Sequence, residues 1–139
     1  MIILDTNVIS DAIAAIPTPR VLEWLAAQPI GDLWTTAVTA AELRAGVSIQ
    51  IDGKKKRNLH EAVEAMLSEE FGGRILPFDE AASIAFARIT ARRRRLGRPV
   101  GLLDTQIAAI AVAKGAAVAT RNDLHFDDPE ITVINPWEA

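Results

Sequence analysis

Short runs of apolar residues alternate along the chain with longer segments in which apolar residues recur every three or four positions. The short runs are typical of buried strands, and the longer segments are typical of helices with one buried face. The expected strands cover residues 2–4, 33–35, 75–78, 117–120 and 131–134. The expected helices cover residues 8–15, 20–28, 39–48, 53–71 and 102–114, with one further long helix that Asp79 caps and that ends in a run of arginines.

This alternation predicts an α/β sandwich around a mostly parallel sheet, with residues 1–139 forming a single domain. No repeat, long linker or break in composition divides the chain. Half of the residues are hydrophobic, which excludes a disordered protein. The longest apolar run, residues 107–113, is far shorter than the roughly 20 residues that cross a bilayer.

The first residues and the lack of cysteine indicate the cellular compartment. The opening MIILDT has no basic stretch and carries an early Asp, so we expect no signal peptide. The absence of Cys excludes disulfides and thiolate metal sites. We therefore expect a cytoplasmic protein with no membrane partner.

The positive charges are concentrated in two places, although the whole chain carries a formal charge of −3. Of its 15 Lys and Arg residues, 10 are Lys54, Lys55, Lys56, Arg57, Arg88, Arg92, Arg93, Arg94, Arg95 and Arg98. Three of these, Arg88, Arg92 and Arg95, share one helical face, whereas Arg93 and Arg94 point elsewhere. Two interpretations stay open: a surface that follows the phosphates of RNA, and a solvated helix end.

Acidic and amide side chains follow the expected strands or begin the expected helices. Asp5 comes directly after the first strand, and Asn122 and Asp123 follow the strand at 117–120. Glu42 and Asp104 lie near helix starts that open on the same edge of a parallel sheet, where ligands bind. Each acid also has a plain structural interpretation as a helix cap, including a T-x-x-E capping box at residues 39–42.

Taken together, these acids favour a metal site over a set of unrelated caps. None of the three segments that carry Asp5, Glu42 and Asp104 supplies a Lys partner, so the carboxylates would repel one another. A hard divalent cation with oxygen ligands, Mg²⁺ or Mn²⁺, is the simplest counter-charge. Zinc does not fit, because the chain offers neither Cys nor a pair of neighbouring His residues.

Five segments carry a resemblance to a known family. ILDTNVIS, TAAELRAG, GLLDTQIAAIA, ATRNDLHF and VINPW occur in this order over nearly the whole chain. In order and spacing they resemble the PIN-domain ribonucleases, above all the VapC-type and FitB-like toxins of type II toxin–antitoxin systems. The resemblance implies a three-layer α/β/α PIN-like domain with a mostly parallel central sheet.

The resemblance also implies roles for individual residues. Asp5 and Asp104 would be the main metal-binding carboxylates and Glu42 the third acid of the catalytic site. The family's fourth acidic position falls at Asn122, and the adjacent Asp123 is the alternative source of a carboxylate. This chain departs from the T-R-N-x-x-D-F pattern because His125 precedes Phe126. We expect substrate contacts from Thr6, Asn7, Thr120, Arg121, Arg92 and Arg95.

The implied activity is that of a Mg²⁺-dependent endoribonuclease that inhibits translation or growth, with Mn²⁺ as a substitute ion. Water activated by the metal would cleave RNA phosphodiester bonds and leave 5′-phosphate and 3′-OH ends. The resemblance further implies a VapB- or FitA-like antitoxin, a homodimer or larger toxin–antitoxin assembly, and contact with DNA only through the antitoxin.

Two other functions compete with this one. A haloacid-dehalogenase-like phosphatase also begins with a strand that ends in Asp, but Asn7 occupies the position of the second acid in its D-x-D pair. A non-catalytic PIN-fold protein that binds RNA without cutting it is the second alternative. An Asp5 phosphoenzyme would identify the first, and binding without cleavage would identify the second.

Overall fold

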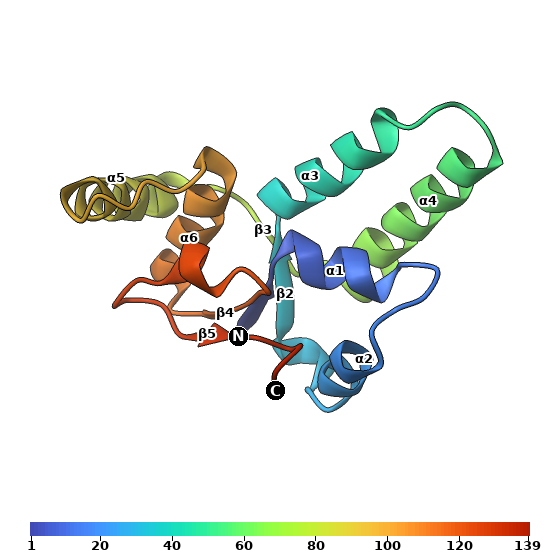
Figure 1. Cartoon of the computed structure of the whole chain (residues 1–139), viewed down its shortest axis with the longest axis horizontal. Coiled ribbons are helices and arrows are strands. Elements are labelled where there is room, and N and C mark those ends of the chain that lie inside the picture. The colour runs from blue at the N-terminus through green and yellow to red at the C-terminus, as the bar shows by residue number, and fades with distance from the viewer.

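The central sheet has five strands, and its middle strand is the first one in the chain (Figure 1). The computed structural model describes residues 1–139. Its strands are β1 (Ile2–Leu4), β2 (Leu33–Thr36), β3 (Ile75–Leu76), β4 (Ala117–Ala119) and β5 (Val133–Ile134). They lie in the order β3-β2-β1-β4-β5, and every neighbouring pair is parallel. Strands expected at 75–78, 117–120 and 131–134 are shorter than predicted, but all five occur where the apolar runs place them.

Six α-helices and three short helical segments connect the strands. The α-helices are α1 (Thr6–Ala12), α2 (Pro19–Ala26), α3 (Ala37–Ser48), α4 (Lys54–Ala65), α5 (Glu80–Arg95) and α6 (Leu102–Lys114). The short segments are η1 (Ile30–Asp32) and η3 (Asp123–Phe126), both 3₁₀-helical, and the π-helical η2 (Met66–Glu70). The single helix predicted at 53–71 is therefore wrong at its end, because the α-helical hydrogen bonding gives way to η2 after Ala65. No helix is long and apolar enough to cross a membrane.

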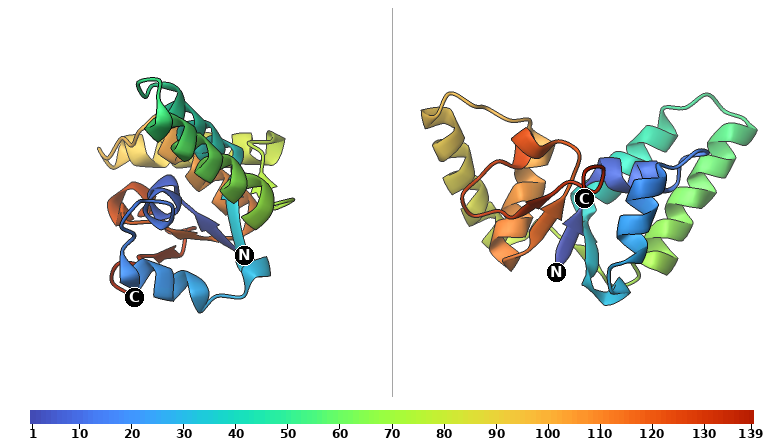
Figure 2. Two further views of the ribbon diagram at one scale, coloured as in Figure 1. Left: turned by 90° about the vertical axis from the view of Figure 1, so that its right-hand side faces the viewer. Right: turned by 60° about the horizontal axis from the view of Figure 1, so that its bottom comes forward.

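The helices pack on both faces of the sheet and form the outer two of three layers (Figure 2). Ile3 is fully buried among residues of α5 and α6, whereas the next residue, Leu4, is buried among residues of α1 to α4. This alternation follows from the strand geometry, in which successive side chains point to opposite faces. The predicted α/β/α architecture is confirmed.

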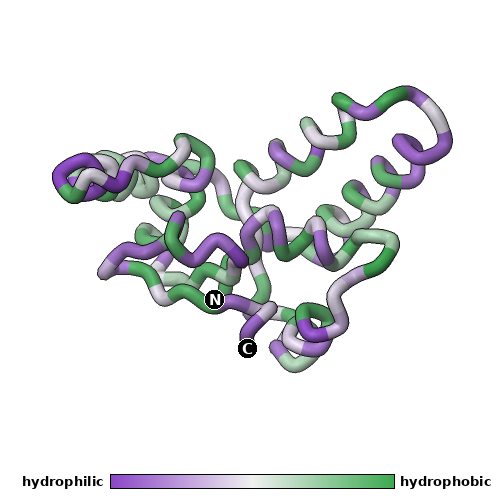
Figure 3. Tube along the Cα trace, in the orientation of Figure 1, coloured by the Kyte–Doolittle hydropathy of each residue, from purple (hydrophilic) through white to green (hydrophobic).

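Hydropathy along the chain follows this layering (Figure 3). Helix α6 is apolar almost throughout, with five consecutive buried residues from Ile107 to Ala111, and it contacts α5 and the sheet. The first turn of α4 carries Lys54, Lys55 and Arg57, all exposed, at the far tip of the α3–α4 hairpin. The basic cluster of α4 thus lies on a projecting part of the molecule.

The sequence offers three possible helix caps, at Asp5, at residues 39–42 and at Asp104, and the structure has only the first of them. Asp5 does cap α1, since its carboxylate accepts a hydrogen bond from the backbone N–H of Thr6 at 2.8 Å. The capping box at residues 39–42 is wrong, because α3 begins earlier and Thr36 is its cap. Helix α6 is capped by Gly101, so Asp104 lies inside the first turn. Glu42 and Asp104 are therefore free of capping roles.

Replacing the Thr36 hydroxyl will test the observed cap. The fully buried Thr36 Oγ1 accepts from the backbone N–H of Thr39 at 3.0 Å. We expect Thr36→Val, which keeps the shape but removes this acceptor, to lower the free energy of unfolding by about 1 kcal/mol in a urea titration. Thr36→Ser should lose less. Equal stability of the Val variant and the unmodified protein would contradict the assignment.

Candidate active site

A polar cavity of about 500 Å³ opens at the carboxyl edge of the sheet. Because all strands are parallel, the loops that follow β1 and β4 meet at this edge, and α3 and α6 begin beside it. The cavity is lined by, among others, Asp5, Glu42, Asp104, Arg121, Asn122 and Trp137. Three carboxylates from distant parts of the sequence therefore face one space, as the sequence predicted.

Asp5 is the most buried of the three acids, with only 2% of the residue exposed. Its carboxylate accepts hydrogen bonds from the Thr120 hydroxyl at 2.8 Å, the Thr6 backbone N–H at 2.8 Å and the Asn7 side chain at 3.3 Å. The pKa of Asp5 is nonetheless raised to about 6, chiefly by burial and also by the charges of Asp104 and Glu42, while the hydrogen bonds lower it. The site thus holds an acid whose ionised form lacks a neighbouring cation.

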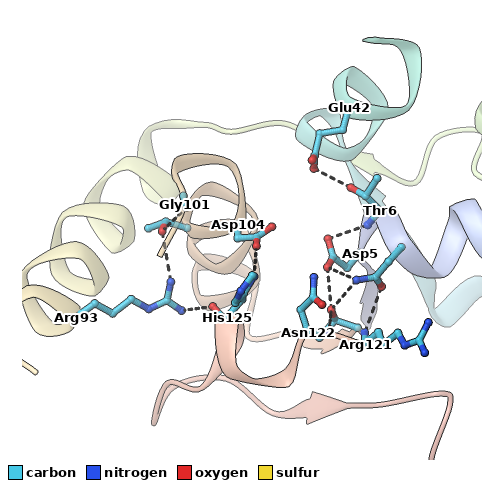
Figure 4. A network of polar contacts seen from close by, with 12 residues as sticks. Asp5, Thr6, Glu42, Arg93, Gly101, Asp104, Arg121, Asn122 and His125 are labelled. Atoms are coloured by element: carbon cyan, nitrogen blue, oxygen red, sulfur yellow. Dashed lines mark hydrogen bonds and ion pairs between the residues drawn. The ribbon is translucent and has the colours of Figure 1, made fainter. Parts of the chain in front are cut away.

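Glu42 and Asp104 each have one partner at the rim of the cavity (Figure 4). The Thr6 hydroxyl donates to Glu42 Oε1 at 2.8 Å, which ties α1 to α3. Asp104 Oδ2 lies 2.6 Å from His125 Nδ1 of η3. His125 is therefore in contact with an acid of the site. The only signal for this contact is the departure of the ATRNDLHF segment from the family pattern.

Asn7 joins the loops that follow β1 and β4. Its side-chain amide donates to Thr120 Oγ1 at 3.3 Å and accepts from the backbone N–H of Arg121 at 3.2 Å. The Thr120 hydroxyl also accepts from the backbone N–H of Asn122 at 3.0 Å. Thr6, Asn7 and Thr120 therefore hold the acids and the loops in place, while their side chains are occupied within the protein.

Arg121 is the only cation that lines the cavity. Its guanidinium lies over the ring of Trp137, 5.3 Å from the ring centroid, so a cation–π contact holds it at the cavity wall. It makes no ion pair with any of the three acids. The sequence predicts Arg121 as a substrate contact, whereas Trp137 is not among the predicted site residues although it lies beside the site.

The structure separates the two candidates for the fourth acidic position. Asn122 lines the cavity, whereas Asp123 does not and instead accepts a hydrogen bond from the Asn135 side chain at 3.1 Å. A further carboxylate, Asp11, lies in the cavity wall but accepts from both the hydroxyl and the N–H of Thr18. Asp11 had no signal in the sequence, because nothing in its own segment sets it apart from an ordinary exposed helix residue.

The two predicted arginine contacts on α5 lie outside the cavity. Arg92 forms ion pairs with Asp128 at 2.6 Å and Glu130 at 2.9 Å, which fasten α5 to the C-terminal segment. Arg95 is exposed, and its side chain makes no ion pair or hydrogen bond. Part of the arginine run thus stabilises the fold through ion pairs. The sequence suggests only an RNA-binding surface or a solvated helix end, and RNA binding by the run stays a prediction.

The donor chemistry of the cavity suits Mg²⁺ or Mn²⁺. Oxygen atoms of Asp5, Glu42 and Asp104 are the ligands that such hard cations prefer, and the charges of Asp104 and Glu42 contribute to the raised pKa of Asp5. In the structure no three acidic or histidine side chains converge closely enough to surround one ion. The residues fit the ion by type and by the cavity they share.

Comparison with known proteins places this geometry in a family. The family model for the PIN domain matches residues 2–130. Toxin FitB of Neisseria gonorrhoeae is 42% identical over 137 residues, covering 99% of both chains. The VapC ribonuclease Y4jK of Sinorhizobium fredii is 42% identical over 138 residues, also 99% of both. The crystal structure of FitAcB from Neisseria gonorrhoeae matches with a TM-score of 0.93 and 41% identity over the full length of both chains.

The buried carboxylate should make the metal-free protein less stable at neutral pH. Since the pKa of Asp5 is about 6 in the folded state against an ordinary 3.8, folding favours the protonated form, and the free energy of unfolding falls as the pH rises through this window. We expect Asp5→Asn, whose amide still caps α1, to be more stable than the unmodified protein by about 1 to 3 kcal/mol at pH 7.5.

Urea titrations in EDTA at pH 4 and pH 7.5 measure this effect. The advantage of Asp5→Asn should largely disappear at pH 4, where the unmodified Asp5 is protonated in the folded protein. Asp52→Asn, which replaces an exposed carboxylate paired with Lys56, serves as the control and should bring no gain at pH 7.5. A destabilised Asp5→Asn at pH 7.5 would contradict the raised pKa.

Proposed function

Because the chain belongs to the PIN-domain family, we propose that it is a Mg²⁺-dependent endoribonuclease, the toxin of a type II toxin–antitoxin module. The observation that carries the proposal is the convergence of Asp5, Glu42 and Asp104 on one cavity at the carboxyl edge of the sheet. The ribonuclease name of the Sinorhizobium relative and the toxin name of the Neisseria relative support it.

The proposed mechanism assigns binding and orientation to residues of this chain. Asp5, Glu42 and Asp104 would hold the ion, with Asn122 facing it as an uncharged neighbour. Bound Mg²⁺ or Mn²⁺ would polarise the phosphoryl oxygen and activate water for attack on the phosphorus. Arg121, fixed over Trp137, would receive a phosphate of the RNA and keep the strand beside the acids.

The residue two positions after Asp5 opposes the phosphatase alternative. The D-x-D pair of that phosphatase needs a second acid there, and an amide cannot take its place in proton transfer. Asn7, which takes the place of the second acid, is itself held between Asp5 and Thr120. In the proposed nuclease, the hydrogen bonds from Thr6, Asn7 and Thr120 would orient the Asp5 carboxylate as a metal ligand.

The partner that we propose is a VapB- or FitA-like antitoxin. The match to the FitAcB structure supports a complex of this kind. In the proposed complex the antitoxin would cover the acidic cavity and would alone contact DNA. Helix α2 offers an apolar surface to such a partner at Leu25, which lines a cavity of about 280 Å³ between α1, α2 and η2. Val21 of the same helix is fully buried in the core. We further propose that the toxin is cytoplasmic and forms a homodimer, alone or within a larger assembly.

Cleavage of total cellular RNA by the purified chain tests the enzyme directly. We expect discrete cuts with Mg²⁺ or Mn²⁺, none with EDTA, and 5′-phosphate with 3′-OH at the ends, because attack by water needs no 2′-OH. Asp5→Asn and Asp104→Asn should each reduce the rate by more than about a hundredfold, since each removes a ligand charge.

Asp52→Asn is the matched control for this assay and should cut at the normal rate, because its carboxylate lies on the α3–α4 connection, outside the cavity. Ends with 2′,3′-cyclic phosphate would rule out the proposed attack by water. A labelled phosphoenzyme lost in Asp5→Asn would favour the phosphatase, and RNA binding without any cut would favour the non-catalytic alternative.

The salt dependence of RNA binding tests the role of Arg121. In an Asp104→Asn background, which prevents cleavage, we expect Arg121→Gln to weaken binding of a single-stranded RNA and to reduce the slope of log K against log salt by roughly 0.7, as for one phosphate contact. Fluorescence anisotropy at several salt concentrations gives this slope.

Arg44→Gln is the control for Arg121, because Arg44 is an exposed cation paired with Glu64 and does not line the cavity. Its slope should stay unchanged. A smaller slope for Arg95→Gln would mean that the RNA also reaches the end of α5. An unchanged slope for Arg121→Gln would remove Arg121 from the substrate path.

A further inference from the structure

His125 and Asp104 form the shortest side-chain contact at the rim of the acidic cavity, with 2.6 Å between Nδ1 and Oδ2 (Figure 4). The two residues lie on different elements, Asp104 in the first turn of α6 and His125 in η3. This bond leaves Asp104 Oδ1 without a protein partner. One oxygen of the carboxylate is therefore held by the protein while the other remains available to a ligand.

The backbone of His125 is fixed, although half of its side chain is exposed. Its N–H donates to the Asn122 carbonyl at 3.0 Å, and its carbonyl accepts from Arg93 Nη2 at 2.8 Å. The next residue, Phe126, is fully buried in the core beside α6. The imidazole thus projects from a turn that is fastened on both sides, unlike a side chain on a free loop.

Arg93 connects this turn to the turn that carries Asp104. It donates through Nη1 to Thr105 Oγ1 at 3.4 Å, and the Thr105 hydroxyl in turn donates to the Gly101 carbonyl at 2.9 Å. Only 5% of Arg93 is exposed, and no carboxylate pairs with it directly. Burial of a guanidinium without an ion-pair partner costs free energy. The hydrogen bonds of Arg93 to the two turns must therefore serve a purpose that offsets this cost.

Orientation of a metal ligand by hydrogen bonds from neighbouring residues is such a purpose. Carboxylates that bind metals are commonly oriented by hydrogen-bond donors behind them, and loss of such a donor weakens metal binding. His125 stands in that relation to Asp104. Arg93 contacts the backbone carbonyl of His125 and the side chain of Thr105, the residue that follows Asp104, and so connects the two turns.

We propose that His125 is a positioning residue whose Nδ1 holds the Asp104 carboxylate toward the cavity, with the buried Arg93 fixing the turns of both residues as one unit. The proposal rests on the proposed function, because it takes Asp104 as a metal ligand. It adds to that function a histidine that the metal ligand requires for its orientation.

Calorimetric titration of the full chain with Mn²⁺, without RNA, tests the proposal apart from catalysis. We expect His125→Ala to weaken Mn²⁺ binding by about tenfold or more. His125→Asn, whose amide nitrogen lies near the place of Nδ1, should restore affinity to within about threefold of the unmodified protein. His60→Ala, at the other histidine of the chain, on α4, is the matched control and should bind normally.

Thermal unfolding in EDTA accompanies each titration, and equal midpoints for the His125 variants exclude a general loss of structure. Arg93→Lys, which keeps the charge but not the two-armed set of donors, should lower Mn²⁺ affinity, and adding His125→Ala should lower it little further. Fully additive losses would remove Arg93 from the unit.

Normal Mn²⁺ binding by His125→Ala would overturn the positioning role while leaving the proposed function intact. Equally weak binding by the Ala and Asn variants would overturn the hydrogen bond as its cause. Absence of Mn²⁺ binding by the unmodified protein would contradict the proposed function and this inference together.

Discussion

The carboxylate of Asp5, buried at the end of the central strand, is the constraint on which the rest of the site depends. Its position follows from β1, which pairs with β2 on one side and β4 on the other. Its negative charge is opposed by burial and by the neighbouring Glu42 and Asp104, so the pKa of Asp5 rises to about 6. Thr6, Asn7 and Thr120 are arranged around this one group, and their hydrogen bonds only partly compensate its burial.

The features that the sequence predicts well are those that depend on local periodicity. Helix α6 begins and ends at the predicted residues, because its run of apolar positions marks the whole segment, and Gly115 in the left-handed conformation ends it. The three acids are also predictable, since parallel strands bring the ends of distant segments to one edge. The helix follows from the apolar pattern of its own segment alone. The convergence of the acids requires, in addition, only that the strands be parallel.

The features that the sequence does not reveal depend on contacts between distant segments. A T-x-x-E pattern marked Thr39 as a cap, yet the chain turns into α3 at Thr36, and both threonines are equally plausible caps in isolation. Arg92 looks like its neighbours until Asp128 and Glu130 arrive from the C-terminal segment. The role of His125 likewise depends on its contact with Asp104, which lies 21 residues away in the sequence.

The strand order has a consequence for synthesis of the chain. Strand β1 is made first, but one of its two neighbours, β4, begins only at residue 117. On the ribosome the central strand must therefore wait for residues 117–119 before its second edge is covered, and Asp5 meets Thr120 only after that. A nascent chain that is interrupted before Thr120 has no complete acidic cavity, so the order of the strands itself delays assembly of the site until this residue has been synthesised.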